Sequence, residues 1–228
     1  MRFPDFVLST LDLNNAALPQ EYYYNSIMFC VIDSVFSINS KYKSTQNTVL
    51  RYCNYNGLIP YRTYGSSSRD IKSEHKIEDF LKLVNGLAYE TIANEIFGNR
   101  QRTSPTNGVL KARAVCEFAY TLYKNEINDF STIYRLFDDG QIESQIKSIK
   151  GQASGLTLTY LYMLTGHDDY IKADRHILNF ITNGIGRQVS KEEAEWMIKD
   201  CVTALKELYP NMTCRLLDYT IWRYMSTK

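Results

Sequence analysis

The stretch SIKGQASGLTLTYLYML, residues 148–164, joins two helical patterns through a short turn of small residues. We expect a short helix over 141–149 and an apolar helix over 156–164. The turn between them, Lys150-Gly151-Gln152-Ala153-Ser154-Gly155, exposes backbone N–H groups at a helix N-terminus, where a phosphate oxygen can bind. The alternative is an ordinary connection between helices, in which the glycines only permit the turn.

Helical periodicity continues along most of the chain. Residues 60–74 and 98–108 are polar and rich in turn-forming residues, which predicts loops. Ser190-Lys-Glu-Glu193 is a capping box that predicts a helix from 191 to about 209, where Pro210 ends it. No stretch alternates as a strand does, so the sequence predicts an all-α fold. Apolar residues recur at three- and four-residue spacing over 23–36, 45–55, 77–86, 89–97, 109–123, 130–137 and 213–225.

Length and composition leave room for one large domain or two small lobes. The 228 residues are 44% hydrophobic, which is enough to bury a core. A formal net charge of +1 argues against a protein held on nucleic acid by bulk charge, although a local basic face would suffice.

The five cysteines are scattered and include no CxxC pair. This spacing predicts buried thiols in a reducing compartment and argues against a zinc site or an iron–sulfur cluster. The N-terminus lacks a signal-peptide pattern, and no segment reaches the ~20 apolar residues of a membrane helix. We therefore expect a cytoplasmic protein that has no contact with a membrane.

The hairpin at residues 149–155 resembles that of the helix-hairpin-helix (HhH-GPD) superfamily of DNA glycosylases. The family pattern is apolar-Pro-Gly-apolar-Gly-x-x-Thr-Ala. Ile149 and Gly151 match the apolar residue and the first glycine. Lys150 replaces the proline and Ala153 replaces the second glycine.

A second motif, IKADRHILNFI at residues 171–181, resembles the family's catalytic segment. Asp174 matches the catalytic aspartate and His176 the histidine that follows it. The 19 residues from Gly155 to Asp174 are close to the family spacing between its lysine position and its aspartate. Asp174 is also a residue type that commonly caps a helix, a role that is compatible with catalysis. For His176 we favour a partly buried position with no chemistry.

Two weaker matches extend the resemblance over most of the chain. Ile32–Ser40 is similar to the family's early helix ending in Leu-Ser-x-Gln, with Asn39 at the amide that enters the space left by the extruded base. Asn39 could equally form a turn at the helix end. Residues 107–113 are similar to the Gly-x-x-x-x-Lys-Ala segment that opens a middle helix, which makes Lys111 a candidate DNA contact. A solvated basic face is the alternative for Lys111 and Arg113.

The resemblance implies a monofunctional DNA glycosylase with Asp174 as its catalytic carboxylate. Members that also cut the strand carry a lysine where this chain has Gly155, so water is the expected nucleophile and an abasic site the product. The implied DNA contacts are Lys150, Gly151, Ala153, Gly155, Asn39 and Lys111. No cofactor or metal is expected; a monovalent cation at the hairpin is the one alternative.

The resemblance also implies two helical lobes with the active-site cleft between them, formed by residues 31–168 and by 1–30 with 169–228. The expected partner is double-stranded DNA with a flipped-out base, bound by a monomer. The excised base is not specified by the sequence. The role is base excision repair or antiviral removal of a bulky modified cytosine.

The loop at 60–74 carries Arg62, Arg69 and Lys72, which could follow phosphates or be solvated. The rival functions are a non-catalytic hairpin DNA-binding protein and an all-α protein-interaction domain.

Overall fold

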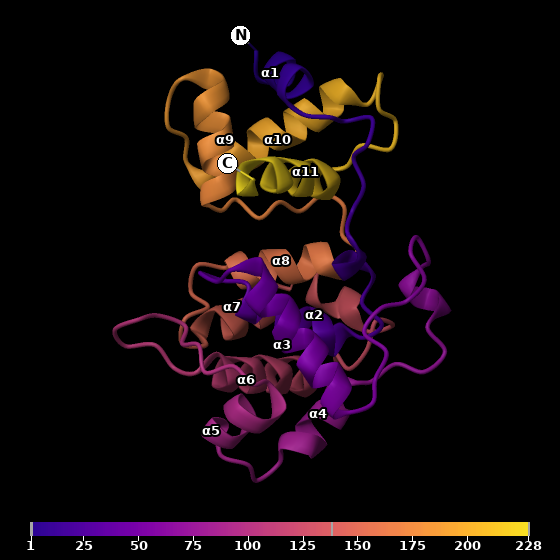
Figure 1. Ribbon diagram of the computed structural model, residues 1–228, viewed down its shortest axis with the longest axis vertical. Coiled ribbons are helices and arrows are strands. Elements are labelled where there is room, and N and C mark those ends of the chain that lie inside the picture. Colours follow the sequence, from indigo (N-terminus) through magenta and orange to yellow (C-terminus); the bar gives the residue numbers. More distant parts are fainter. Residues whose placement is uncertain (1, 138, 228) are drawn as a thin grey trace. The chain divides into compact units, whose positions relative to one another are not determined.

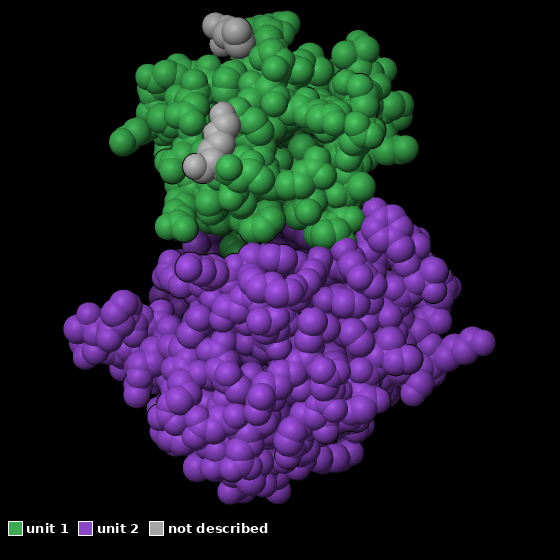
Figure 2. Space-filling view, viewed as in Figure 1, with its two compact units in different colours: residues 1–19, 166–228 green, residues 20–165 purple. Residues whose placement is uncertain are grey.

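The computed structural model of the protein describes residues 2–137 and 139–227. These residues form helices and loops, with two isolated β-bridges and no β-strand among them (Figure 1). The predicted all-α fold is therefore confirmed. The chain divides into two compact units, residues 1–19 with 166–228 (unit 1) and residues 20–165 (unit 2), which Figure 2 colours separately.

Unit 2 is built around α2 (Ile27–Phe36), in which every residue is buried. Ser26 begins the helix because its hydroxyl accepts the N–H of Met28 at 3.0 Å. The helix packs against α3 (Tyr42–Tyr55), α6 (Lys111–Lys124) and α8 (Leu156–Leu164). A helix that is buried on every side has to be surrounded by others, and α2 forms the centre of the unit.

The remaining elements of unit 2 surround this centre. The helix pattern predicted at 89–97 is α5 (Tyr89–Thr91) followed by a π-helix, η3 (Ile92–Ile96), and the pattern at 130–137 is a 3₁₀-helix, η4 (Ile133–Leu136). The other elements are η1 (Gln20–Tyr23), η2 (Ser68–Asp70), α4 (Ile77–Val84) and α7 (Gly140–Ser148).

Unit 1 joins the N-terminal segment to the C-terminal helices. Its elements are α1 (Phe3–Thr10), α9 (Arg175–Ile185), α10 (Lys191–Leu205) and α11 (Cys214–Ser226). The ring centroids of Phe6 and Phe180 lie 5.1 Å apart, and a Cβ at Gly184 would stand 2.4 Å from Phe6 Cδ1. Gly184 thus lets α1 approach α9 closely enough to complete the core of the unit.

The structure places both boundaries of unit 2 earlier than the sequence suggested. A boundary at residue 31 would cut α2, and the residues before this helix already pack within unit 2. The ring of Tyr22 meets that of Tyr160 edge-on, and Tyr24 stacks on Tyr61. Unit 2 therefore starts at Gln20 rather than at residue 31, and it ends at Thr165 rather than at 168.

The predicted capping box at the start of α10 is half formed. Ser190 accepts the N–H of Glu193 at 3.1 Å, as a capping box requires, but the Glu193 carboxylate pairs with Arg187.

The five cysteines are free and buried, as their spacing predicted. None of the described helices combines the length and the apolar character that a membrane crossing needs.

Candidate functional site

Asp174 is the N-cap of α9 in unit 1. Its backbone is extended, and its Oδ1 accepts the N–H of His176 at 2.8 Å. The side chain is half-buried, so the carboxylate is fixed at the start of the helix and is still reached by solvent. The capping role is therefore present. Because Oδ2 lies outside that bond, the same carboxylate can also act on a ligand.

A second carboxyl group, that of Asp218 on α11, lies in the core beneath this segment. It is 5% exposed, and its Oδ1 accepts the N–H of Lys172 at 3.0 Å. Burial first, and then the negative charge of Asp174, raise the pKa of Asp218 well above its usual value. The site therefore combines a fixed, accessible carboxylate with a buried acid that favours its neutral form.

Sequence reasoning missed Asp218, although the sequence contained a signal. Cys214, Leu217 and Ile221 form the buried stripe of α11, and Asp218 falls within that stripe. A carboxyl group on the apolar face of an amphipathic helix is costly unless it is paired or neutral. Such a position marks a residue with a specific task.

His176 is half-buried, as predicted. The backbone N–H of His176 donates to the Asp174 carboxylate, and this is how His176 takes part in the site. The structure thus brings together Asp174, His176, Lys172 and Asp218 in unit 1.

The predicted hairpin lies in unit 2 between α7 and α8. Gly151 and Gly155 have left-handed backbones, with φ of 93° and 73°. Two short-range bonds close the turn, from the N–H of Gln152 to Ile149 O at 2.9 Å and from the N–H of Gly155 to Gln152 O at 3.0 Å. Lys150, Gly151, Ala153 and Ser154 are exposed, so the tip of the turn is accessible.

The structure gives a reason for a glycine at position 151 that the sequence did not show. A Cβ at this position would stand 2.3 Å from the Cβ of Thr103, which belongs to the loop at 98–110. That loop is itself held by Thr103, whose N–H donates to Val109 O at 2.9 Å. Gly151 is therefore required by packing and by its positive φ, whether or not a phosphate binds there.

Gln152 points into the unit from the hairpin. It is 3% exposed, and its Oε1 is buried without a hydrogen-bond partner among the described residues. An oxygen in that position is a suitable ligand for a monovalent cation or a water. The cation at the hairpin stays a prediction, and Gln152 is the side chain that fits it.

Lys111 corrects one predicted DNA contact. The side chain is 2% exposed, and its Nζ donates to the carbonyl oxygens of Phe36 at 2.9 Å and Ile38 at 2.6 Å. A third bond, 3.2 Å long, reaches Gln101 Oε1. The expectation of a solvated basic face was wrong for Lys111, because its ammonium group donates to the carbonyl of the last residue of α2, Phe36, and to that of Ile38 just beyond it. Its ammonium group is enclosed and does not lie on a surface that DNA could meet.

Asn39 is exposed at the tip of the loop that Lys111 holds. Its φ of 52° is left-handed, a conformation that asparagine adopts more readily than most residues. The turn-forming role is therefore present. Lys111 supports the loop from inside, while Asn39 projects from its outer side.

The polar stretch at 60–74 is more ordered than a solvated loop. Arg62 donates to the carbonyl oxygens of Tyr24 and Ser66, so its guanidinium is a structural group. Glu74 caps α2 by accepting the N–H of Ile27 at 2.9 Å. Burial raises the pKa of Glu74 to about 7. Of the three predicted basic residues, Arg69 and Lys72 are exposed.

No curated protein and no solved structure matches the sequence. A family model does match, over residues 5–226, which is nearly the whole chain. The protein therefore belongs to the family described as a domain of unknown function (DUF8548).

Proposed function

We propose that the protein is a monofunctional DNA glycosylase that hydrolyses the N-glycosidic bond of a flipped-out base. The observation that carries the proposal is the position of Asp174. Its carboxylate is fixed by one backbone bond through Oδ1, is half-buried, and keeps Oδ2 outside that bond. A preorganised negative charge of this kind suits a reaction in which positive charge develops.

The chemistry follows from the charge of Asp174. As the glycosidic bond breaks, its electron pair leaves with the base nitrogen and the sugar gains oxocarbenium character at C1′. Asp174 stabilises that cation and accepts a proton from the attacking water, whose oxygen bonds to C1′. The departing base takes a proton from solvent, Asp174 releases to solvent the proton that it accepted, and an abasic site remains on the strand.

The hairpin supplies the proposed contact with the DNA backbone. Its exposed residues, Lys150, Gly151, Ala153 and Ser154, lie at the N-terminal side of α8. Backbone N–H groups and the positive end of the α8 dipole would bind a phosphate there. The helix-hairpin-helix assignment and the cleft that it implies stay predictions.

The absence of lyase chemistry is also proposed. Gly155 stands where lyase members carry a lysine, and it cannot supply an amine. Lys150 is the lysine of the turn and precedes that position by five residues. Water is therefore the proposed nucleophile.

The decisive experiment measures free base directly. The protein is incubated with duplexes that contain damaged bases or bulky modified cytosines, and released bases are identified by mass spectrometry. Release of one class by the parent, and its loss in Asp174→Asn, would support both the reaction and the substrate class. If no duplex in either set loses a base, the proposal fails.

A second candidate function rests on the capping bond itself. The capping of α9 is by itself a sufficient reason for an aspartate at position 174. A protein that only binds DNA through the hairpin would therefore need the same residue. Such a protein would bind duplexes in a salt-dependent manner and release no base.

A further inference from the structure

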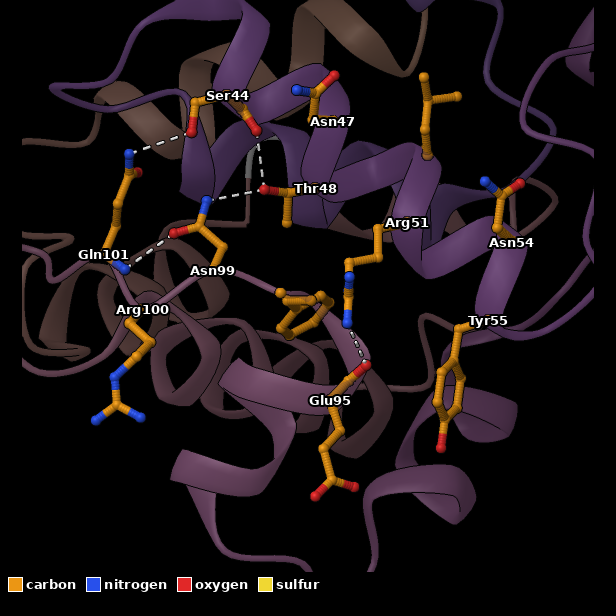
Figure 3. Close-up of a pocket in the computed structure, with 13 residues that line it drawn as sticks. Ser44, Asn47, Thr48, Arg51, Asn54, Tyr55, Glu95, Asn99, Arg100 and Gln101 are labelled. Carbon is orange, nitrogen blue, oxygen red and sulfur yellow. Dashed lines mark hydrogen bonds between the residues drawn. The ribbon is translucent and has the colours of Figure 1, made fainter.

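A polar groove in unit 2, separate from the hairpin, has the features of a strand-binding site. Its volume is about 1120 Å³. One wall is a face of α3, and the other comes from η3 and the loop that follows it (Figure 3). The α3 wall presents Ser44, Asn47, Arg51, Asn54 and Tyr55, which recur at helical spacing on one side of the helix.

Arg51 reaches from the α3 wall of this groove to the opposite wall. Its Nη2 donates to the carbonyl oxygens of Asn94 and Glu95, each at 3.4 Å. Gly98 has a φ of 58°, and a Cβ there would stand 2.4 Å from Arg51 Cδ and Nε. The glycine therefore leaves the space that the arginine occupies. These bonds use one nitrogen of the guanidinium, whose other nitrogens remain suited to a phosphate.

One end of the groove is connected to the loop that carries Asn39. Gln101 donates through Nε2 to Ser44 Oγ at 3.3 Å, and its Oε1 accepts from Ser40 Oγ at 3.2 Å. The buried ammonium of Lys111 also donates to Gln101 Oε1. The groove and the Asn39 loop thus share one hydrogen-bonded network, so a strand that passes Asn39 could continue into the groove.

The chemistry of the lining matches a nucleic-acid strand. Arginine binds phosphate, amide side chains pair with base edges, and an exposed tyrosine offers a face for base stacking. Tyr55 is 53% exposed, and Asn47 and Asn54 are exposed as well. Arg100 lies at the rim, where it donates to Asn94 Oδ1 at 2.8 Å. The two arginines outweigh the single acidic side chain of the lining, that of Glu95.

We infer that this groove binds a short stretch of single-stranded DNA. The inference rests on the proposed function for its choice of DNA. From Ser44 to Tyr55 the α3 wall is roughly 17 Å long, which is the rise of about five stacked nucleotides. The groove thus extends the DNA contact to unpaired nucleotides, and it favours substrates that contain a single-stranded stretch.

The test measures how the full-length protein binds a dye-labelled single-stranded oligonucleotide of about 12 nucleotides, by fluorescence anisotropy at several salt concentrations. The double variant Asn47→Asp, Asn54→Asp places two negative charges in the groove without changing side-chain size. We expect Kd to rise about tenfold at low salt. The matched control, Asn14→Asp with Asn211→Asp, makes the same change at exposed sites of unit 1 and should leave Kd within about twofold of the parent.

Arg51→Gln provides an independent variant. Loss of one phosphate contact should reduce the slope of log Kd against log salt by about 0.7. Thermal melts identify any variant that fails to fold. The inference is overturned if the parent shows no salt-dependent binding, or if the groove variant binds as tightly as its control. Base release is measured separately, so strand binding without base release would reject the glycosylase and retain the groove.

Discussion

Asp218 accepts the backbone N–H of Lys172 at 3.0 Å, two residues before Asp174 enters α9. The accepting oxygen belongs to a side chain that is 5% exposed and lies among the apolar residues of unit 1. A buried acid on α11 therefore fixes the approach of the chain to the proposed catalytic carboxylate. Asp218 acts through the backbone, so it is a positioning residue.

The raised pKa of Asp218 predicts how stability changes with pH. The folded state keeps a proton on this group above about pH 4, where the unfolded chain has lost it. The free energy of unfolding should therefore fall as pH rises from about 4 towards the folded-state pKa. Asp218→Asn cannot titrate and should flatten this dependence in melts recorded between pH 4 and 8. Glu74, with its own raised pKa, leaves part of the slope in place.

Asp200→Asn is the matched control for this experiment. Asp200 lies on α10 of the same unit and is exposed, so its replacement removes a carboxyl group without disturbing the buried core. A slope for Asp218→Asn that equals that of the parent would show that Asp218 is ionised in the folded protein.

Lys111 and Arg113 make a second matched pair. Lys111→Met removes the donor to Phe36 O and Ile38 O and should lower the free energy of unfolding by about 2–4 kcal/mol. Arg113→Met breaks an ion pair with Glu117 at the surface and should lower the free energy of unfolding far less. Urea denaturation of both variants measures the difference. Equal losses would contradict the structural role of Lys111.

The contrast between these two residues shows how far sequence reasoning extends. Apolar spacing and caps predicted α2, α8 and α9, because these signals lie within one helix. The burial of Lys111 could not be predicted, because the carbonyl groups that it meets lie 73 and 75 residues away in sequence. A charged residue type predicts an exposed side chain on average. That prediction fails where the carbonyl groups at the end of a helix need a hydrogen-bond donor.

The same limit applies at the hairpin and at η3. The turn was predicted from its glycines, but the contact of Gly151 with Thr103 depends on a loop far away in sequence. The five-residue π-helix Ile92–Ile96 shares its apolar pattern with an α-helix, so periodicity could not separate the two. For the candidate site, the sequence predicted Asp174 and its cap and missed Asp218.

The hairpin prediction is best tested with charge, because bulk at Gly151 would disturb Thr103. Gly151→Val should lower the melting temperature through that contact and its positive φ, which obscures any effect on DNA. Ser154→Asp places a negative charge at the exposed tip and should weaken binding to every duplex by about fivefold to tenfold. Ser144→Asp, at an exposed position within α7, is the control. Equal affinities for the two aspartate variants would mean that the hairpin is only a turn.

The product of the reaction distinguishes the two modes of glycosylase chemistry. With water as nucleophile, borohydride should trap no covalent enzyme–DNA adduct, and strands should break only after alkali or heat. The readout is a denaturing gel of labelled duplex, with and without borohydride. A trapped species that disappears in Lys150→Gln would make Lys150 the nucleophile and would replace the hydrolytic mechanism.

Asp174→Asn separates catalysis from capping. Asparagine caps a helix about as well as aspartate, so the variant should keep its fold and most of its affinity for DNA. It lacks the charge that stabilises the sugar cation, so base release should fall by ~10²–10⁴. Asp174→Ala loses the cap as well and should lower the free energy of unfolding by about 0.5–2 kcal/mol. Single-turnover base release and thermal melts on both variants give the two quantities. If Asp174→Asn releases base at the rate of the parent, the carboxylate is a cap and nothing more.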